Sequence, residues 1–394
     1  SLDDVVVNEK FISDNNNNNK FGYIDGKQDS NFNKIVKDGY TLMGWSTDRN
    51  AKKAMYSVNS PINDKFFLIG KNIKLYAVWY RNVDLALFIG QSNMVGSVGN
   101  REEEKYPDIR DITGLVDSDI VNNYKTMNYV SVPIKKGVAF QYSAIKNRLE
   151  EITPSTKYFG EEVNYYKGTI VNHNANFKYS SLERSEGTNM IPEFARTYTE
   201  KTGHLLVTVM GANRGEKIGT FLPYNDPLNR ANKYIFESIK ISYLNAVKYL
   251  ESHGCYIKNK FYVIFQGCAD TTYDLTKNST YYNTYMKFHK LYKKEFGLSF
   301  GTIVYTSYFP ATLYQERNTF VKEINKQHRL LIANNKDIIF GSDLSYKSYL
   351  NQNTQLFGLT RYANASDNSI HLTSAALSQI GRDCANNVSK YIKK

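Results

Sequence analysis

The stretch LALFIGQSNMVG, residues 85–96, joins a run of apolar residues to a short polar segment that contains a lone serine. The run is typical of a buried β-strand, and it stops at Gly90. Gln91, Ser92 and Asn93 follow directly, so a small nucleophile lies between two amide side chains. A strand that ends in this way either places a reactive hydroxyl at the edge of a sheet or simply stops, and the rest of the chain has to decide.

Short apolar segments alternate with longer helical patterns from residue 84 onward. Strands are predicted at 85–89, 205–210, 261–265, 302–305 and 337–340, and helices near 190–202, 229–252, 280–296, 314–335 and 373–392. Buried strands interleaved with helices favour a parallel sheet that is covered on both faces. Ligand sites in such sheets lie beyond the carboxyl ends of the strands, and this is where Ser92 falls.

The sequence divides into three parts. Residues 1–20 end in a run of asparagines and are predicted to form a flexible segment, whereas residues 21–81 show the alternation of a small β-rich domain. Residues 82–394 form the α/β domain, with a long insertion at about 95–190 that includes an amphipathic piece at 142–152. Because so long a connection is usually functional, we expect its loops to cross the active edge of the sheet and to wall the substrate site.

Composition excludes several classes of protein. The chain of 394 residues is 41% hydrophobic, with a formal net charge of +12. No apolar stretch approaches the roughly 20 residues of a membrane helix, and no nucleic-acid-binding motif is present. We therefore expect no membrane span and no nucleic-acid partner, whereas the positive charge suits contact with an anionic glycan or a cell wall. The three cysteines are an odd number, which does not suit a disulfide framework, and no Cys/His cluster has the spacing of a structural zinc site.

The segment SDNSIHLTS, residues 366–374, contains the best candidate for a general base. A serine hydroxyl needs such a base in order to act as a nucleophile, and a third group usually orients the base. His371 lies in this polar loop directly before the last helical pattern, and Asp367 stands four residues earlier. The other five histidines are interpreted as surface or packing residues. A loop at the carboxyl edge of the sheet can present His371 and Asp367 toward Ser92.

Three segments that follow predicted strands could supply the donors that an oxyanion requires. Ser92 offers its own backbone N–H. The segment VMGANRGEKIG contains Gly211 and Gly215, whose backbone can approach a ligand closely. The segment FQGCADTT offers the side-chain amide of Gln266. Each signal alone is weak, but their joint position after successive strands is not expected by chance.

These blocks resemble the SGNH (GDSL-like) hydrolase superfamily in type and order: GQSN, a Gly-containing loop, QG-x-x-D and an Asp–His loop before the final helix. Within it, FIGQSNMVG, FQGCAD and HLTSAALSQIG are similar to the branch of sialate O-acetylesterases and carbohydrate esterase family 6. The resemblance covers about residues 83–394. It implies a flavodoxin-like, three-layer α/β/α domain with a central parallel sheet.

The resemblance also implies roles for single residues. Ser92 would be the nucleophile and His371 the general base. The backbone N–H groups of Ser92 and Gly215, with the Gln266 side chain, would form the oxyanion hole, and Gly215 is favoured over Gly211. No metal or cofactor takes part in this chemistry.

The chain departs from the family pattern in the Asp–His loop. The family's acid usually lies three residues before the histidine, where this chain has Asn368. Either the loop bulges by one residue and Asp367 orients the histidine, or Asn368 does so and the third member is neutral. The amides of Gln91 and Asn93 are expected to support the turn that carries the nucleophile.

The amino-terminal part carries a second resemblance. DGYTLMGWSTD followed by KLYAVW is similar to the Listeria–Bacteroides repeat of the internalin B-repeat type, a small β module of bacterial surface and secreted proteins. It implies an extracellular or cell-surface location. The polar start SLDD has no signal-peptide character, so the sequence is expected to be a processed or trimmed fragment.

Three functions remain open at this point. The first is a serine-dependent carbohydrate O-acetylesterase that removes acetyl groups from sialic acid, or from another cell-surface or plant glycan, through an acetyl-enzyme intermediate. The second is a sugar O-acetyltransferase with the same serine chemistry. The third is a glycan-binding surface protein whose esterase site has decayed.

Overall fold

The structure is a computed structural model, and it describes residues 4–7, 23–24, 27–28, 36–58, 73–95, 134–144, 146–152, 189–307, 315–346, 372 and 374–392. The chain forms two compact units. The first comprises Ser1–Val83 with Lys248–Lys258, and the second comprises Asp84–Val247 with Asn259–Lys394. Each unit is described by itself.

The first unit is built on antiparallel strands. Strand β4, Tyr40–Ser46, pairs with β5, Tyr56–Ser57, and with the first half of β6, Ile73–Gly90. A side chain at Gly44 would place its Cβ 2.0 Å from the Tyr56 carbonyl oxygen, so only glycine lets β5 lie this close.

Two short elements complete what is described of this unit. Strand β1, Asp4–Val7, pairs antiparallel with β6, although the sequence analysis expects a flexible segment there. Its three consecutive valines favour a strand. A two-stranded ribbon joins β2, Tyr23–Ile24, to β3, Lys27–Gln28.

The second unit contains the mostly parallel sheet that the sequence predicts. In order along the sheet, the strands are β12 Ile338–Ser342, β11 Phe300–Val304, β10 Cys255–Phe265, β6, β9 Leu205–Ala212, β7 Ala139–Ser143 and β8 Arg148–Glu151. The pairs β10–β11, β11–β12 and β7–β9 are parallel, and β8 lies antiparallel to β7. The five predicted strands are all present, and the α/β class is confirmed.

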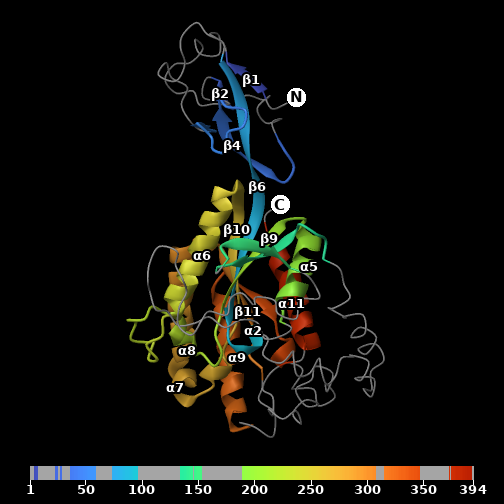
Figure 1. The fold of residues 1–394 in the computed structure, drawn as a ribbon. Helices are drawn as coiled ribbons and strands as arrows, with labels where there is room; N and C mark the ends of the chain where they lie inside the picture. Colours follow the sequence, from blue (N-terminus) through green and yellow to red (C-terminus); the bar gives the residue numbers. More distant parts are fainter. Residues whose placement is uncertain are drawn as a thin grey trace, which may run out of the picture. The chain divides into compact units, whose positions relative to one another are not determined.

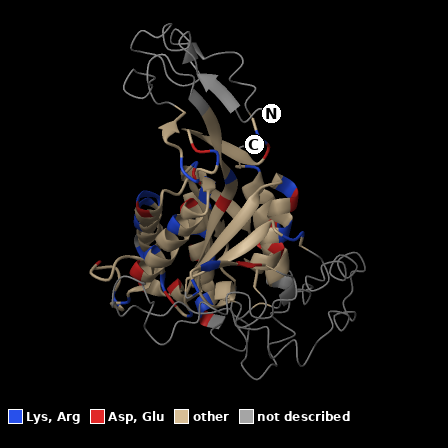
Figure 2. Cartoon of the chain, turned by 45° about the horizontal axis from the view of Figure 1, so that its top comes forward, with Lys and Arg blue, Asp and Glu red and all other residues tan. Residues whose placement is uncertain are grey.

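Helices cover both faces of this sheet (Figure 1). Helices α5, Ile191–Thr202, and α11, Ser374–Ser389, lie together on one face, whereas α6, Ile235–Ser252, and α8, Thr280–Phe296, lie on the other. Helix α9, Asn318–Asn334, packs beside α8. Figure 2 shows the charged residues of this unit mainly on helices and loops, as expected when the strands are buried on both faces. In the described part of the chain, no helix is both long enough and apolar enough to cross a membrane.

The hairpin of β7 and β8 differs from the loop expected within the long insertion. Its first strand joins the sheet in register with β9, and residues Ala139 and Tyr142 are buried. The segment 139–151 therefore extends the sheet and does not cross its active edge. Most of the remaining insertion lies outside the described residues, so the expected substrate wall stays a prediction there.

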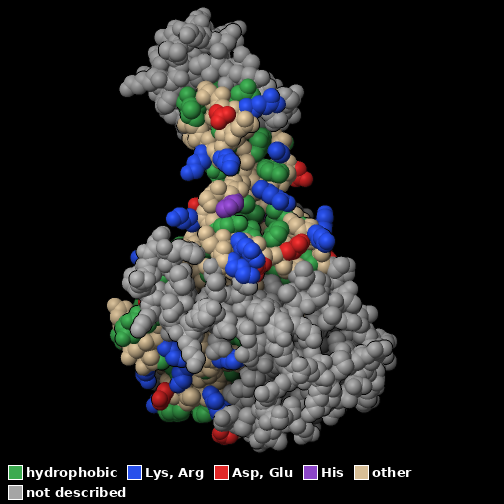
Figure 3. All heavy atoms as spheres, in the orientation of Figure 1, with side chains coloured by type: hydrophobic (Ala, Val, Ile, Leu, Met, Phe, Trp, Pro, Cys, Tyr) green, Lys and Arg blue, Asp and Glu red, His purple; other side chains and the backbone are tan. Residues whose placement is uncertain are grey.

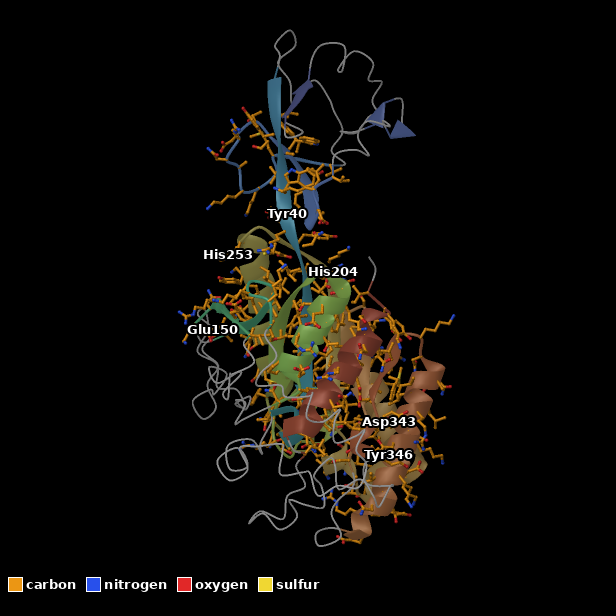
Figure 4. The ribbon with its side chains drawn as sticks, turned by 90° about the vertical axis from the view of Figure 1, so that its right-hand side faces the viewer. Tyr40, Glu150, His204, His253, Asp343 and Tyr346 are labelled. Atoms are coloured by element: carbon orange, nitrogen blue, oxygen red, sulfur yellow. The ribbon has the colours of Figure 1, made fainter. Side chains whose placement is uncertain are left out.

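A buried carboxylate joins three elements of the second unit and the residue that precedes a fourth. Asp84, on β6, is 1% exposed and accepts hydrogen bonds from the Tyr198 hydroxyl at 2.5 Å and from Asn259 Nδ2 at 2.7 Å. The Nδ1 atom of His204 lies 2.8 Å from the same carboxylate, and Figure 4 shows this histidine beside α5. These partners come from α5, β10 and the residue before β9, so Asp84 fixes their mutual positions.

We expect the Asp84→Ala variant to lose roughly 3 kcal/mol of unfolding free energy, because three polar partners would be left unsatisfied in a buried site. The milder Tyr198→Phe change removes one of the three bonds and should cost about 1 kcal/mol. Urea denaturation followed by circular dichroism measures both. Equal losses in the two variants would contradict the role of Asp84 as the shared acceptor.

Candidate functional site

Ser92 begins a helix directly at the end of strand β6. The helix α2, Ser92–Val95, starts on the carbonyl of Gln91, which accepts the Met94 N–H at 2.8 Å. The serine residue is 6% exposed. Gly90 has a φ of +157°, and a Cβ there would lie 2.3 Å from the Phe265 carbonyl oxygen. Glycine is therefore required for β6 to end against β10 and for the chain to turn at Ser92.

The carboxyl ends of three strands meet at this turn. The Gln91 N–H donates to the Phe265 carbonyl at the end of β10, at 3.3 Å. The Asn213 N–H, just after β9, donates to the Gly90 carbonyl at 2.9 Å. The loops that follow β6, β9 and β10 thus leave the sheet at one place, as predicted from the sequence.

Asn93 ties the carboxyl-terminal block to the serine turn. Its side chain is 1% exposed, and its Oδ1 accepts the backbone N–H of Leu372 at 3.0 Å. Leu372 directly follows His371 in the sequence. Among the described residues, the Nδ2 atom of Asn93 has no hydrogen-bond partner. A buried amide nitrogen without a partner is uncommon in folded proteins, so this atom is a notable feature of the turn.

Three predicted site residues lie outside the described residues. These are His371, Asp367 and Asn368. Their roles stay predictions, and the position of Leu372 is the structural information nearest to them.

Gln266 follows β10 and has both of its amide hydrogens in use. Its Nε2 donates to the Glu216 carbonyl at 3.1 Å and to the carboxylate of Asp270. Its Oε1 accepts the Tyr281 hydroxyl at 2.9 Å. The side chain therefore bridges the loops after β9 and β10. In this arrangement it has no amide hydrogen left for the oxyanion contact that the sequence predicts for it.

Asp270 holds the same two loops together. It is 0% exposed and accepts the Ile218 N–H at 3.1 Å as well as the Gln266 amide. Burial raises the pKa of this carboxyl to about 7, although its hydrogen bonds and the nearby Lys217 and Arg317 act in the opposite direction. The QG-x-x-D pattern in the sequence is the signal that points to this residue.

Gly215 lies in the loop that these contacts clamp. Its φ is +67°, in the left-handed region that favours glycine, and a Cβ there would meet nothing within 4 Å. The loop is fixed on one side by the Asn213 bond to β6 and on the other by the Glu216 carbonyl. Gly215 is thus set in a short turn that is anchored on both sides, two residues after the contact of Asn213 with β6.

The amide of Gln91 supports the turn from a third side. Its Oε1 accepts the Ala269 N–H at 3.3 Å, within the 3-10 helix η5, Cys268–Asp270. Arg317 donates to the Cys268 and Thr271 carbonyls at 3.0 and 3.1 Å and holds the other side of that segment.

The buried histidines of this unit serve the fold. His328 is 1% exposed, and its Nε2 lies 2.9 Å from the Tyr281 hydroxyl. Burial lowers the pKa of His328 to about 3, so it is neutral at ordinary pH. Burial also lowers the pKa of His289, whose Nδ1 lies 2.8 Å from the Tyr262 hydroxyl. Within the part of the chain that the structure describes, no three His, Cys, Asp or Glu side chains are grouped for a metal ion.

Comparisons with known proteins give weak matches. The chain matches no family model, and its sequence matches no curated protein. Among solved structures, an Arabidopsis thaliana protein is 16% identical with a TM-score of 0.46, covering 78% of this chain and 98% of that one. A carbohydrate acetylesterase from Xanthomonas citri is 13% identical with a TM-score of 0.39, covering 80% and 59%. An acetylxylan esterase from Geobacillus stearothermophilus is 11% identical with a TM-score of 0.36, covering 79% and 95%.

We expect the contribution of Asp270 to the unfolding free energy to fall as the pH rises from about 4 to about 7, whereas the buried, neutral His328 contributes a change of the opposite sign over part of this range. The pKa of Asp270 is about 7 when folded, against a usual value of 3.8. Folding therefore takes up a proton at Asp270 in this pH range. As the pH rises through it, the contribution of this group lowers the unfolding free energy by up to about 4 kcal/mol in total. Asp270→Asn should lack this component, as urea denaturation across that pH range would measure.

The matched control for this experiment is Asp274→Asn, which removes an exposed carboxyl only four residues away. Its stability should follow the same pH curve as the unaltered protein. If the Asp270→Asn curve also ran parallel to that of the unaltered protein, the raised pKa would be wrong.

Proposed function

We propose that the chain is a serine-dependent carbohydrate O-acetylesterase with Ser92 as its nucleophile. The observation that carries the proposal is the 3.0 Å hydrogen bond from the Leu372 N–H to Asn93 Oδ1. It joins the residue after His371 to the residue after Ser92. The residue that follows the proposed base is thus held at the turn that bears the proposed nucleophile, which supports the juxtaposition that acyl transfer by serine requires.

In the proposed reaction, His371 takes the proton of Ser92 Oγ as this oxygen attacks the carbonyl carbon of the acetyl ester. The oxyanion accepts hydrogen bonds from the backbone N–H groups of Ser92 and Gly215. The bond from the carbonyl carbon to the sugar oxygen then breaks, and His371 returns the proton to that oxygen. Water attacks the acetyl-enzyme with His371 as its base, and acetate leaves. Asp367 orients the imidazole in this scheme, with Asn368 as the alternative.

We assign Gln266 a positioning role in place of the donor role that the resemblance implies. Both of its amide hydrogens have acceptors, on Glu216 and Asp270. Through the Glu216 carbonyl, Gln266 fixes the residue next to Gly215. Gln266 thus supports the proposed backbone donor indirectly, through the neighbouring residue Glu216.

The proposed substrate is an acetylated carbohydrate, from sialic acid or from another cell-surface or plant glycan. The motifs FIGQSNMVG, FQGCAD and HLTSAALSQIG support this class of ester, since they resemble the esterase branch named above. We also propose an extracellular or cell-surface setting and a B-repeat-like module at residues 21–81. Both rest on the resemblance of the amino-terminal motifs alone.

We expect Ser92→Ala and His371→Ala each to lower kcat on an aryl acetate by at least about 10³-fold, because the nucleophile and its base act as one unit. In the same assay, Asp367→Ala should lose more activity than Asn368→Ala. Initial rates of acetate release at fixed pH measure all four variants against the unaltered protein.

Several outcomes of this assay would overturn the proposal. An unaltered protein that neither turns over the aryl acetate nor reacts with a serine-directed phosphonate is not a serine esterase, and the decayed-site alternative would take its place. Acetyl transfer that requires an added acceptor sugar would favour the transferase.

We expect Asn93→Ala to lower kcat roughly 10–100-fold with little change in KM, because the proposed base would lose its anchor while the substrate contacts remain. Asn283→Ala is the matched control, since Asn283 is an exposed asparagine on α8. The pH profile of kcat should shift for Asn93→Ala only. A change confined to thermal stability would mean that Asn93 has a purely structural role.

A further inference from the structure

A groove of about 630 Å³ lies in the second unit, away from the cluster around Ser92. It is lined by Tyr273 of α7, Tyr273–Thr276, by one face of α9, and by Tyr346 after β12. Figure 4 labels Tyr346 beside the orange helix α9. The volume is that of a site for a small molecule or for a short stretch of polymer.

The groove has a strongly positive lining. Helix α9 contributes Lys322, Lys326 and Arg329, which are spaced at i, i+4 and i+7 and so share one face of the helix. Lys277 adds a fourth positive charge, and the single acidic side chain is Glu323, 3.6 Å from Lys326. Figure 3 shows Lys and Arg side chains together with a few Asp and Glu side chains on the lower left of the surface, where α7 and α8 lie in Figure 1. Like charges at this helical spacing destabilise a helix by themselves, so an anionic ligand would relieve the repulsion.

Aromatic rings are interleaved with these charges. Tyr273 is 59% exposed, and Lys277 Nζ lies 5.2 Å from the centre of its ring. Phe320 and Tyr346 also line the groove. A flat ring presents an apolar face that matches the C–H face of a sugar ring, while ammonium and guanidinium groups bind carboxylates. Rings and positive charges together fit a carbohydrate that bears carboxylates.

The groove lies along the same edge of the sheet as Ser92. Tyr273 follows Asp270 by three residues, and Tyr346 follows the end of β12. Strand β12 is three strands from β6 in the sheet order, which corresponds to roughly 14 Å at the usual strand spacing. A chain of a few sugar units covers such a distance.

We infer that this groove is a distal subsite that binds carboxylate-bearing units of an acidic polysaccharide while an acetylated unit of the same chain reaches Ser92. The inference rests on the proposed function for the identity of the polymer, and it narrows the substrate class from any acetylated carbohydrate to an acidic one. Single-stranded nucleic acid also suits rings and positive charges. The position of the groove along the same edge of the sheet as the proposed esterase site favours the polysaccharide.

The test compares two double variants that remove the same charge. Lys322→Ala with Arg329→Ala alters the groove, and Lys290→Ala with Lys294→Ala alters exposed positions of α8 outside it. Binding of a galacturonate hexamer is measured by titration calorimetry. We expect about tenfold weaker binding for the groove variant, because each exposed charged contact contributes roughly a factor of three. The α8 variant should bind as the unaltered protein does, and added salt should weaken binding.

Three results would overturn the inference. The first is equal binding of the hexamer by both variants. The second is binding of a neutral xylose hexamer by the unaltered protein as tightly as the galacturonate hexamer. The third is a single-stranded oligonucleotide that the unaltered protein binds more tightly than the galacturonate hexamer and the groove variant does not bind, which would make nucleic acid the occupant. Hydrolysis of an aryl acetate should be unchanged in both variants. If the protein binds the hexamer through the groove but hydrolyses no ester, the esterase proposal is wrong, whereas the groove remains a binding site for an acidic polysaccharide.

Discussion

The close approach of strands β6 and β10 at Gly90 is the constraint on which the candidate site depends. A single Cβ at this position would lie 2.3 Å from the Phe265 carbonyl oxygen. Because Gly90 has no Cβ, the chain can turn against the neighbouring strand and start helix α2 directly afterwards. Ser92 therefore lies where the loops after β6, β9 and β10 begin. Close-packed interiors relax little around such a clash, and a bulkier residue would separate the strands that bring these loops together.

A chain of buried polar contacts then fixes the loops relative to one another. Asp270, Gln266 and Tyr281 are each almost fully buried and bond in sequence, with the Ile218 N–H at one end and His328 at the other. Such a network is costly to bury unless its members are satisfied, and here each has partners. It confers rigidity on the loop that carries Gly215, the backbone donor proposed above, and rigid donors are those that stabilise a developing charge best.

Much of this architecture could be predicted because it depends on local patterns. The apolar runs of the strands and the periodicity of the helices give the parallel sheet, and the glycine and polar residues after 85–89 mark the edge where Ser92 lies. The sequence patterns do not reveal the strand at Asp4–Val7 or the hairpin at 139–151. Both are short, and each joins its sheet by pairing with a strand distant in the sequence, β6 for the first and β9 for the second. The sequence locates the amide of Gln266 but not its hydrogen-bond acceptors. One acceptor is the Glu216 carbonyl, 50 residues away, and the other is the carboxylate of Asp270, four residues away.

The contact between Asn93 and Leu372 joins positions that are 279 residues apart. During synthesis at roughly 5–20 residues per second, the serine turn would leave the ribosome some 15–60 seconds before its partner. The strands of the sheet can pair in that interval, but this support of the turn cannot form until the last segment has docked. The same segment delivers α11, the helix that covers one face of the sheet with α5, so the site and the last layer of the fold would be completed together.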